Sequence, residues 1–218
     1  MTFFQITLQL LNGFLYTLAI FGITLAASLP LGLMISLGSM SKFKPLNKLS
    51  RGFVWIIRGT PLMLQIIVFA LGPGLWLGIP IRETWQQLVM VCIAFTINYA
   101  CYFSEIYRGG IQSIPQGQYE AGQVLGMTKS QIFFRVILLQ VVKRIVAPMS
   151  NEVITLVKDT ALASVVISVD LFTVAQRIVN KEVVLWPLFY AGLFYLIFNG
   201  LLSVLLGKVE KKLSYFKV

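Results

Sequence analysis

Residues 8–38 read LQLLNGFLYTLAIFGITLAASLPLGLMISLG and contain no Asp, Glu, Lys or Arg. A helix of about 20 apolar residues is long enough to cross the hydrocarbon core of a bilayer. Because no Lys or Arg occurs in the first 41 residues, the run lacks the basic start of a signal peptide, and we expect it to be retained as a span. The whole chain is similarly apolar, since 57% of its 218 residues are hydrophobic and only 12% are charged. The sequence therefore predicts an all-α polytopic membrane protein.

Four more apolar runs follow the first, separated by charged residues, glycine or proline. Residues 72–74 (GPG) and 78–80 (GIP) mark an external turn after the second run. The fourth run is interrupted by Pro148 and by residues 158–160 (KDT). We predict a single transmembrane domain over residues 1–218 with five transmembrane helices. The expected spans are residues 8–38, 52–71, 85–111, 132–157 with a broken continuation to 169, and 183–206.

Basic residues are unevenly divided between the two sides of these spans, eleven against four. Lys and Arg are retained on the cytoplasmic side of membrane proteins. We therefore expect the N-terminus outside and the C-terminus in the cytoplasm, which agrees with an odd number of spans. Arg58, Lys143 and Arg144 are left out of the count because they fall within spans or near their ends. The two groups are Lys42, Lys44, Lys48, Arg51, Arg108, Lys129, Arg135, Lys208, Lys211, Lys212 and Lys217 on one side, and Arg82, Lys158, Arg177 and Lys181 on the other.

Several kinds of chemistry are excluded by residue types that the chain lacks. It contains no histidine, which excludes a Ser-His-Asp triad and a HExxH zinc helix. Cys92 and Cys101 lie in one apolar run at a spacing that suits no metal site, so we interpret them as core residues. No G-x-x-x-x-G-K-[ST] phosphate loop is present. The net charge of +10 lies mostly in short loops between apolar runs, which favours a membrane over nucleic acid. The sequence thus predicts neither an enzyme nor a bound cofactor or metal.

The segment between the third and fourth runs, residues 113–129, reads SIPQGQYEAGQVLGMTK. Ser113 can cap a helix and Pro115 can occupy its first turn, so a helix is expected over about 115–129. Its apolar side chains have no further chain to cover them, which predicts a partner protein; the alternative is a helix lying on lipid headgroups. These side chains are Tyr119, Val124, Leu125 and Met127.

Glu120, Ala121 and Gly126 resemble the EAA motif of binding-protein-dependent ABC importer permeases, in which Glu-Ala-Ala and a later Gly form a cytoplasmic coupling helix. The chain departs from the motif at Gly122, where the family has a second Ala, and at residues 138–139, which are Leu-Leu instead of Leu-Pro. The resemblance implies that this helix contacts a separate ATPase. The implied coupling residues are Tyr119, Glu120, Ala121, Val124, Leu125 and Gly126.

Residues 58–62 (RGTPL), 102–110 (YFSEIYRGG) and 158–162 (KDTAL) look like the polar amino acid branch of the same family. The resemblance implies the five-span type I importer fold and a bacterial inner-membrane location. It also implies a second permease subunit, identical or different, an extracytoplasmic solute-binding protein, and P-loop ATPase subunits that bind ATP and Mg. The chain would then be the transport subunit of an ATP-driven amino acid importer.

The fourth run places Pro148, Glu152, Thr155 and Asp159 on one helix face by the i, i+4, i+7 spacing. Charged residues inside a membrane are costly and usually face a partner or a water-filled path, and broken helices hold the midplane sites of many transporters. The alternative for both acids is a salt bridge to Lys158 or another neighbour. We interpret this face as part of a solute path.

In the third run Asn98, Tyr102 and Glu105 share a face. Their alternatives are an interhelical hydrogen-bond network for Asn98 and a structural ion pair with Arg108 for Glu105. Arg58 is interpreted as an anchor of the Gly-Thr-Pro break. The expected solute-contact residues are Gln65, Asn98, Tyr102, Glu152, Thr155, Lys158, Asp159 and Thr160.

A zwitterion needs one cationic and one anionic partner, and a basic side chain needs a further acid. Glu152 and Asp159 together exceed the requirement of a neutral amino acid, which favours arginine, histidine or lysine. Two alternatives to the importer remain at this stage. One is a self-contained ion-coupled amino acid transporter or channel in which both acids titrate, and the other is a structural membrane subunit.

Overall fold

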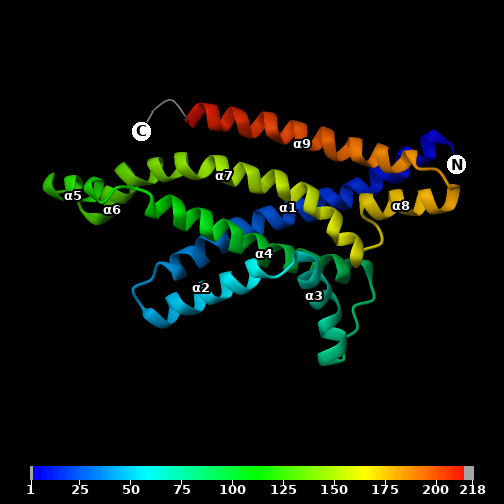
Figure 1. Cartoon of the computed structure of the whole chain (residues 1–218), viewed down its shortest axis with the longest axis horizontal. Helices are drawn as coiled ribbons and strands as arrows, with labels where there is room; N and C mark the ends of the chain where they lie inside the picture. The colour runs from blue at the N-terminus through cyan, green and yellow to red at the C-terminus, as the bar shows by residue number, and fades with distance from the viewer. Residues whose placement is uncertain (1, 214–218) are drawn as a thin grey trace.

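The computed structural model describes residues 2–213, and these are helical with short connections (Figure 1). Lys217, which was counted among the basic residues, and the end of the expected 1–218 domain lie outside the described residues. Four long helices extend along the molecule, with α4 packed against α1 and α7, and α7 against α9. They are α1 (Phe3–Ser39), α4 (Thr84–Gln112), α7 (Leu138–Asp159) and α9 (Trp186–Leu213).

Shorter helices complete the fold at the two ends and on one side. The N-terminus and α8 lie at one end of the long helices, whereas α5, α6 and the end of α9 lie at the other (Figure 1). A π-helical segment, Phe133–Ile137, leads into α7, and a 3₁₀ segment, Thr160–Val165, follows it. The shorter helices are α2 (Lys44–Gly59), α3 (Leu62–Leu77), α5 (Gln116–Val124), α6 (Lys129–Ile132) and α8 (Leu171–Glu182).

The most extensive helix contact, between α1 and α4, depends on small residues at four-residue intervals along α1. Thr24, Ser28, Gly32 and Ser36 occupy successive turns of one face, and all are buried. Small side chains at this spacing let the backbones of two membrane helices approach closely. At Gly32 the two backbones lie so close that an added Cβ would be 2.8 Å from the carbonyl oxygen of Ala100.

Gly32→Ala should therefore lower the thermal unfolding midpoint of the purified protein. The new methyl group meets backbone that cannot move aside, and overpacking of this kind costs about 1–3 kcal/mol. The matched control is Gly22→Ala on the same helix, where an added Cβ meets nothing within 4 Å. Circular dichroism in detergent measures both midpoints, and equal midpoints for the two variants would contradict the close contact.

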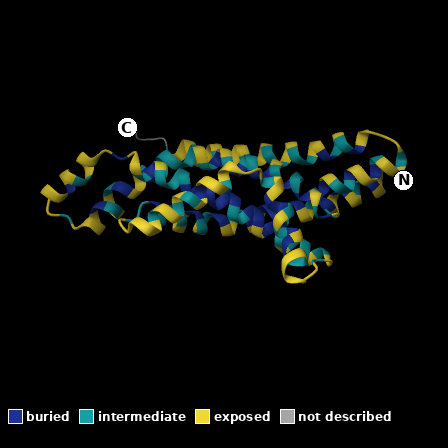
Figure 2. Cartoon of the chain, turned by 60° about the horizontal axis from the view of Figure 1, so that its bottom comes forward, coloured by how far each residue is buried: buried dark blue, intermediate teal, exposed yellow. Residues whose placement is uncertain are grey.

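A central core forms where α1, α4 and α7 meet (Figure 2). Phe95, Tyr99 and Phe103 follow one another at four-residue intervals along α4, and each is at most 2% exposed. The Tyr99 ring lies 6.4 Å from the ring of Phe95 and 6.1 Å from the ring of Phe103, centroid to centroid. This row fixes the rotation of α4 about its axis and therefore determines which α4 side chains face α7.

The expected span 52–71 is two helices, because α2 and α3 are bent by 103° relative to each other. Thr60 precedes Pro61 and is extended, with φ −116° and ψ 144°. A residue before proline is pushed out of the helical region by the proline ring, so the apolar run breaks there. Residues 44–48, which lie between the first two expected spans, form the first turn of α2, with Pro45 in that turn.

Three helices of the described chain are long and apolar enough to cross a membrane, α1, α4 and α9, and the bent α2–α3 pair is a fourth if it counts as one span. Although α7 is 22 residues long, it carries five charged residues and does not qualify. They are Lys143, Arg144, Glu152, Lys158 and Asp159. The all-helical prediction agrees with the structure, whereas a total of five spans stays a prediction.

Candidate functional site

A cavity of about 430 Å³ lies between the α2–α3 break, α4 and α7. Five consecutive residues of the break, 58–62, form one wall. The other walls come from two helix faces. These contribute Asn98, Tyr99 and Tyr102 from α4, and Glu152, Thr155 and Asp159 from α7.

The carboxylates of α7 line the cavity on one helix face, as their spacing predicts. Tyr99 donates a hydrogen bond from its hydroxyl to Oδ2 of Asp159 at 2.7 Å. Because Tyr99 is only 2% exposed, this bond holds the Asp159 side chain in a fixed orientation. Tyr99 is not among the site residues expected from the sequence, since its place between Phe95 and Phe103 gives it the pattern of a core aromatic residue.

The α2–α3 break is held open by the side-chain amide of Gln65. Its Nε2 donates to the carbonyl oxygen of Ile57 at 2.8 Å and to Oγ1 of Thr60 at 2.8 Å. Asn98 in turn donates from Nδ2 to Oε1 of Gln65 at 3.0 Å. The last carbonyls of a helix lack partners within it, and Gln65 supplies one here. Gln65 is buried and does not line the cavity.

Five of the eight expected solute-contact residues meet at this cavity, and three do not. Lys158 is exposed and lies outside the lining, because one residue along a helix turns a side chain by about 100° from Asp159. Thr160 is fully buried, and its hydroxyl donates to the carbonyl oxygen of Val157 at 2.6 Å. The third is Gln65, which instead supports the break.

Arg58, interpreted from sequence as an anchor of the break, lines the cavity itself. Its guanidinium carbon lies 5.0 Å from the centre of the Tyr102 ring, within the range of a cation–π contact. Nη1 of Arg58 is 3.8 Å from Oε2 of Glu105. The expected pair between Glu105 and Arg108 is present and closer, with donor–acceptor distances of 3.0 and 2.5 Å.

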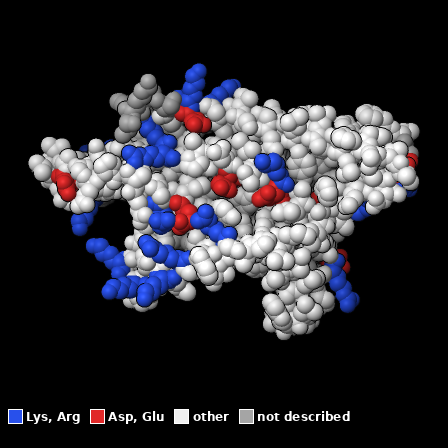
Figure 3. All heavy atoms as spheres, viewed as in Figure 1, with Lys and Arg blue, Asp and Glu red and all other residues white. Residues whose placement is uncertain are grey.

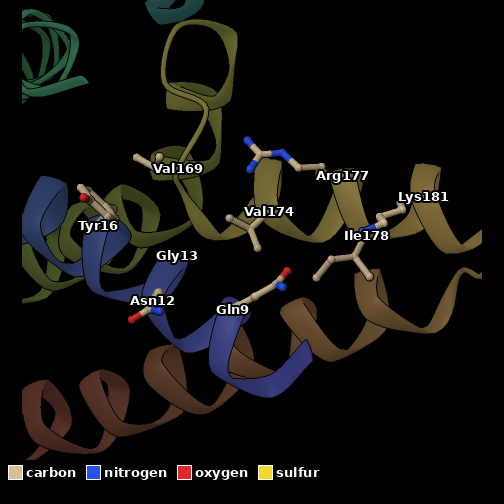
Figure 4. Close-up of a pocket in the computed structure, with 9 residues that line it drawn as sticks. All are labelled: Gln9, Asn12, Gly13, Tyr16, Val169, Val174, Arg177, Ile178 and Lys181. Carbon is tan, nitrogen blue, oxygen red and sulfur yellow. The ribbon is translucent and has the colours of Figure 1, made fainter. Parts of the chain in front are cut away.

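A second cavity, of about 410 Å³, lies between α1 and α8 near the N-terminus (Figure 4). Gln9 points from α1 toward Val174 and Ile178, while Arg177 and Lys181 project from α8. None of the described residues that line it is acidic. Because it offers no anion for an ammonium group and contains none of the expected site residues, we do not assign the solute to it.

The expected coupling helix, 115–129, is shorter in the structure and ends in a glycine turn. Helix α5 stops at Val124, and Gly126 follows with φ +72°. The amide of Met127 donates to the carbonyl oxygen of Gly122 at 3.0 Å. A left-handed residue after a helix is usually glycine, because most side chains strain in that conformation. Thr128 then begins α6 as its N-cap, accepting from the amide of Gln131.

The apolar side chains of this segment divide into covered and exposed groups. Tyr119 and Met127 pack against a cluster that includes Ile132, so the expectation that no part of the chain covers them is wrong for these two. Val124 and Leu125 are 88% and 78% exposed. Of the other expected coupling residues, Glu120 and Ala121 are also exposed.

Gly122, which replaces the second Ala of the motif, is buried against α6. An added Cβ would lie 2.6 Å from Cγ1 of Ile132. The departure from the motif therefore lets α5 and α6 pack closely, and it leaves the exposed face of α5 unchanged.

Comparison with known proteins decides the family. Residues 28–215 match the family described as "Binding-protein-dependent transport system inner membrane component". The chain belongs to this family. As a member, it is a multi-pass inner-membrane subunit of an ABC importer and not an enzyme, and ATP hydrolysis is done by separate subunits.

Relatives of this inner-membrane component align over nearly its whole length. The L-cystine transport system permease protein TcyB of Bacillus subtilis is 37% identical, covering 94% of this chain and 86% of the relative. The arginine transport system permease protein ArtQ of the same organism is 34% identical, covering 94% and 92%. These alignments confirm the resemblance drawn from residues 58–62, 102–110 and 158–162.

Solved structures support the same fold. The crystal structure of an amino acid ABC transporter with histidines matches with a TM-score of 0.85 and 29% identity, covering 94% of each chain. The MetNI methionine ABC transporter matches with a TM-score of 0.75 at 18% identity, covering 98% of this chain and 100% of that one; at this identity the match concerns the fold alone. The type I importer fold expected from the sequence is confirmed.

Proposed function

We propose that this chain forms the translocation path for polar, preferentially basic, amino acids in an ATP-driven importer, and that the path passes through the cavity between the α2–α3 break, α4 and α7. The observation that carries the proposal is the pair of carboxylates, Glu152 and Asp159, lining one cavity with Arg58. These charges sum to −1, which complements an amino acid of net charge +1. The cavity volume of about 430 Å³ lies within the range of small-molecule sites, about 300–1,000 Å³.

The relatives support an amino acid substrate through their names, which refer to L-cystine, glutamine and arginine. The solved transporter with histidines adds another basic amino acid. Within the cavity, we assign solute contact to Asn98, Tyr102, Glu152, Thr155 and Asp159. Gln65 supports the break, and neither Lys158 nor Thr160 lines the cavity.

The coupling surface is proposed to be the exposed face of α5 and the turn that follows it. The ATPase would contact the four exposed residues of this surface, Glu120, Ala121, Val124 and Leu125. Tyr119 and Gly126 shape the segment. An importer explains why two large apolar side chains lie exposed beside polar ones at the end of the molecule. In a self-contained ion-coupled transporter, this exposed apolar surface would have no partner protein to cover it.

The full assembly proposed is this chain with a second permease subunit, identical or different, two P-loop ATPase subunits that bind ATP and Mg, an extracytoplasmic solute-binding protein and surrounding membrane lipid. Orientation follows the basic residues, which gather toward the end that carries α5 (Figure 3). That end is proposed to be cytoplasmic, with the N-terminus outside. We propose the spans expected from the sequence, with the second span divided at Pro61.

The proposal is tested by reconstituting the purified complex in vesicles and measuring uptake of labelled arginine, lysine, glutamine and cystine. Uptake of arginine or lysine is expected to require ATP and the binding protein and to exceed uptake of glutamine. A matched preparation whose ATPase cannot hydrolyse ATP is the control. Uptake that does not require ATP but depends on a proton or sodium gradient would establish the ion-coupled alternative instead.

A further inference from the structure

Arg58 lies where two cavities meet. Besides the cavity between the α2–α3 break, α4 and α7, it lines a smaller cavity of about 340 Å³ with Arg51, Trp55, Glu105 and Arg108. This smaller cavity is distinct from the one between α1 and α8. It is the one residue that the two linings share among the described residues. The sharp bend that follows Gly59 ends α2 at this point, so the last turn of α2 presents its cation to both spaces.

The guanidinium of Arg58 is held loosely. Glu105 already receives two short hydrogen bonds from Arg108, at 3.0 and 2.5 Å, whereas its oxygen lies 3.8 Å from the nearest nitrogen of Arg58. Within the described chain, no hydrogen bond from the Arg58 side chain is found, and its other contact is the Tyr102 ring. Arginine binds carboxylates best through two parallel hydrogen bonds, and that capacity is unused here.

The charges around the cavity between the α2–α3 break, α4 and α7 are arranged by sign. Its two carboxylates, Glu152 and Asp159, come from α7, while its cation comes from the end of α2. More than half of the Arg58 side chain is covered, since its exposure is 41%, and its guanidinium lies over the Tyr102 ring. An α-amino acid carries its carboxylate and ammonium on the same carbon atom and so needs both signs in one small space.

We propose that Arg58 is the carboxylate-binding residue of the transmembrane solute site. When solute binds, the guanidinium moves away from the Glu105 oxygen and contacts the solute carboxylate instead. The inference rests on the proposed function and adds a specificity: the site accepts α-amino acids and discriminates against analogues without a free carboxylate. Glu105 is the internal competitor for the same guanidinium. Solute and Glu105 therefore bind Arg58 in alternation.

The test measures direct binding to the permease–ATPase complex without the solute-binding protein, so that the external protein's own selectivity does not enter. Labelled arginine is bound at equilibrium and competed with unlabelled arginine or with argininamide, whose carboxamide replaces the carboxylate. The same measurement is repeated for labelled lysine and lysinamide. The variants are Arg58→Gln, Arg58→Lys and Glu105→Gln. Arg82→Gln, an equivalent change in the exposed segment before α4, is the matched control.

In the wild type, the amino acid should bind at least about tenfold more tightly than its amide, the equivalent of one charge-assisted interaction. Arg58→Gln should remove that difference while leaving the affinity for the amide within about twofold. Arg58→Lys should restore part of it, since an ammonium keeps the charge but not the paired donors. Glu105→Gln should tighten binding of the amino acid and not of the amide.

If Arg58→Gln weakens binding of the amino acid and of the amide equally, the residue has a structural role and the inference is wrong. The inference is also wrong if Arg58→Gln leaves both affinities as they are in the wild type. Either result leaves the proposed function standing, because the solute would still bind in the wild type. If wild-type complex binds neither amino acid while the complete system transports them, the cavity is not a stable solute site and the inference fails. Absence of ATP-dependent amino acid uptake by the complete system would instead contradict the proposed function.

Discussion

Replacing Leu125 by aspartate should leave the permease folded in the membrane and remove its ATPase. The side chain is 78% exposed and follows α5 directly, so the substitution disturbs no contact within the chain's core. In the assembly it would place an unpaired carboxylate in an apolar contact, where loss of a central side chain costs about 2 kcal/mol or more. Copurification of the ATPase in mild detergent, quantified by mass spectrometry, should fall at least about tenfold.

The matched control is Val183→Asp, which makes a similar change in the connection between α8 and α9. Val183 is 87% exposed and has φ 54°, a conformation that aspartate adopts more easily than valine. Its ATPase content should equal that of the wild type. Retention of the ATPase by Leu125→Asp would show that the end of α5 is not the coupling surface.

The second large effect is expected for Asp159→Asn, which should reduce uptake of arginine and lysine about tenfold or more. Asparagine keeps the shape of the side chain and can still accept from the Tyr99 hydroxyl, which lies 2.7 Å from Oδ2. What it loses is the charge, and a hydrogen bond to a charged group contributes about 1.5–3 kcal/mol. Initial rates of labelled solute uptake by the reconstituted complex give the effect directly.

Two comparisons make this experiment specific. Glu210→Gln removes one carboxylate from the exposed end of α9 and should transport like the wild type. Uptake of glutamine, if the complex carries it, should fall less than uptake of arginine in Asp159→Asn, because a neutral side chain needs no second acid. Full uptake of basic amino acids by Asp159→Asn would remove the basis for a basic substrate.

Helical periodicity was sufficient to predict the α7 face of the candidate site. Glu152, Thr155 and Asp159 line the cavity because the i, i+3, i+4 geometry of an α-helix holds whatever surrounds it. The membrane composition and the family motifs were likewise readable without coordinates, since they depend on residue types and spacing alone. Proposals from those patterns needed no knowledge of tertiary contacts.

Contacts between distant segments account for what the sequence could not predict. Asn98 orients Gln65 and Tyr99 orients Asp159 through hydrogen bonds across 33 and 60 residues of chain, which no local pattern records. The Gly-Thr-Pro break at residues 59–61 was visible in the sequence, but the angle of 103° between α2 and α3 was not. Tyr119 was expected to be uncovered. In the structure, residues more than a dozen positions further along the chain, among them Ile132, fold back over it.

The four-residue repeat of Thr24, Ser28, Gly32 and Ser36 has a consequence for how the transporter moves. Backbones in such close contact cannot slide past each other by a fraction of a turn without collision at Gly32, so α1 and α4 should travel as one rigid body. Because only residues 113–115 separate α4 from α5, a displacement imposed on α5 reaches the wall of the cavity with little lost to bending. The opening and closing of the path must then take place where packing is less tight, on the sides formed by α7 and by the hinge at Pro61.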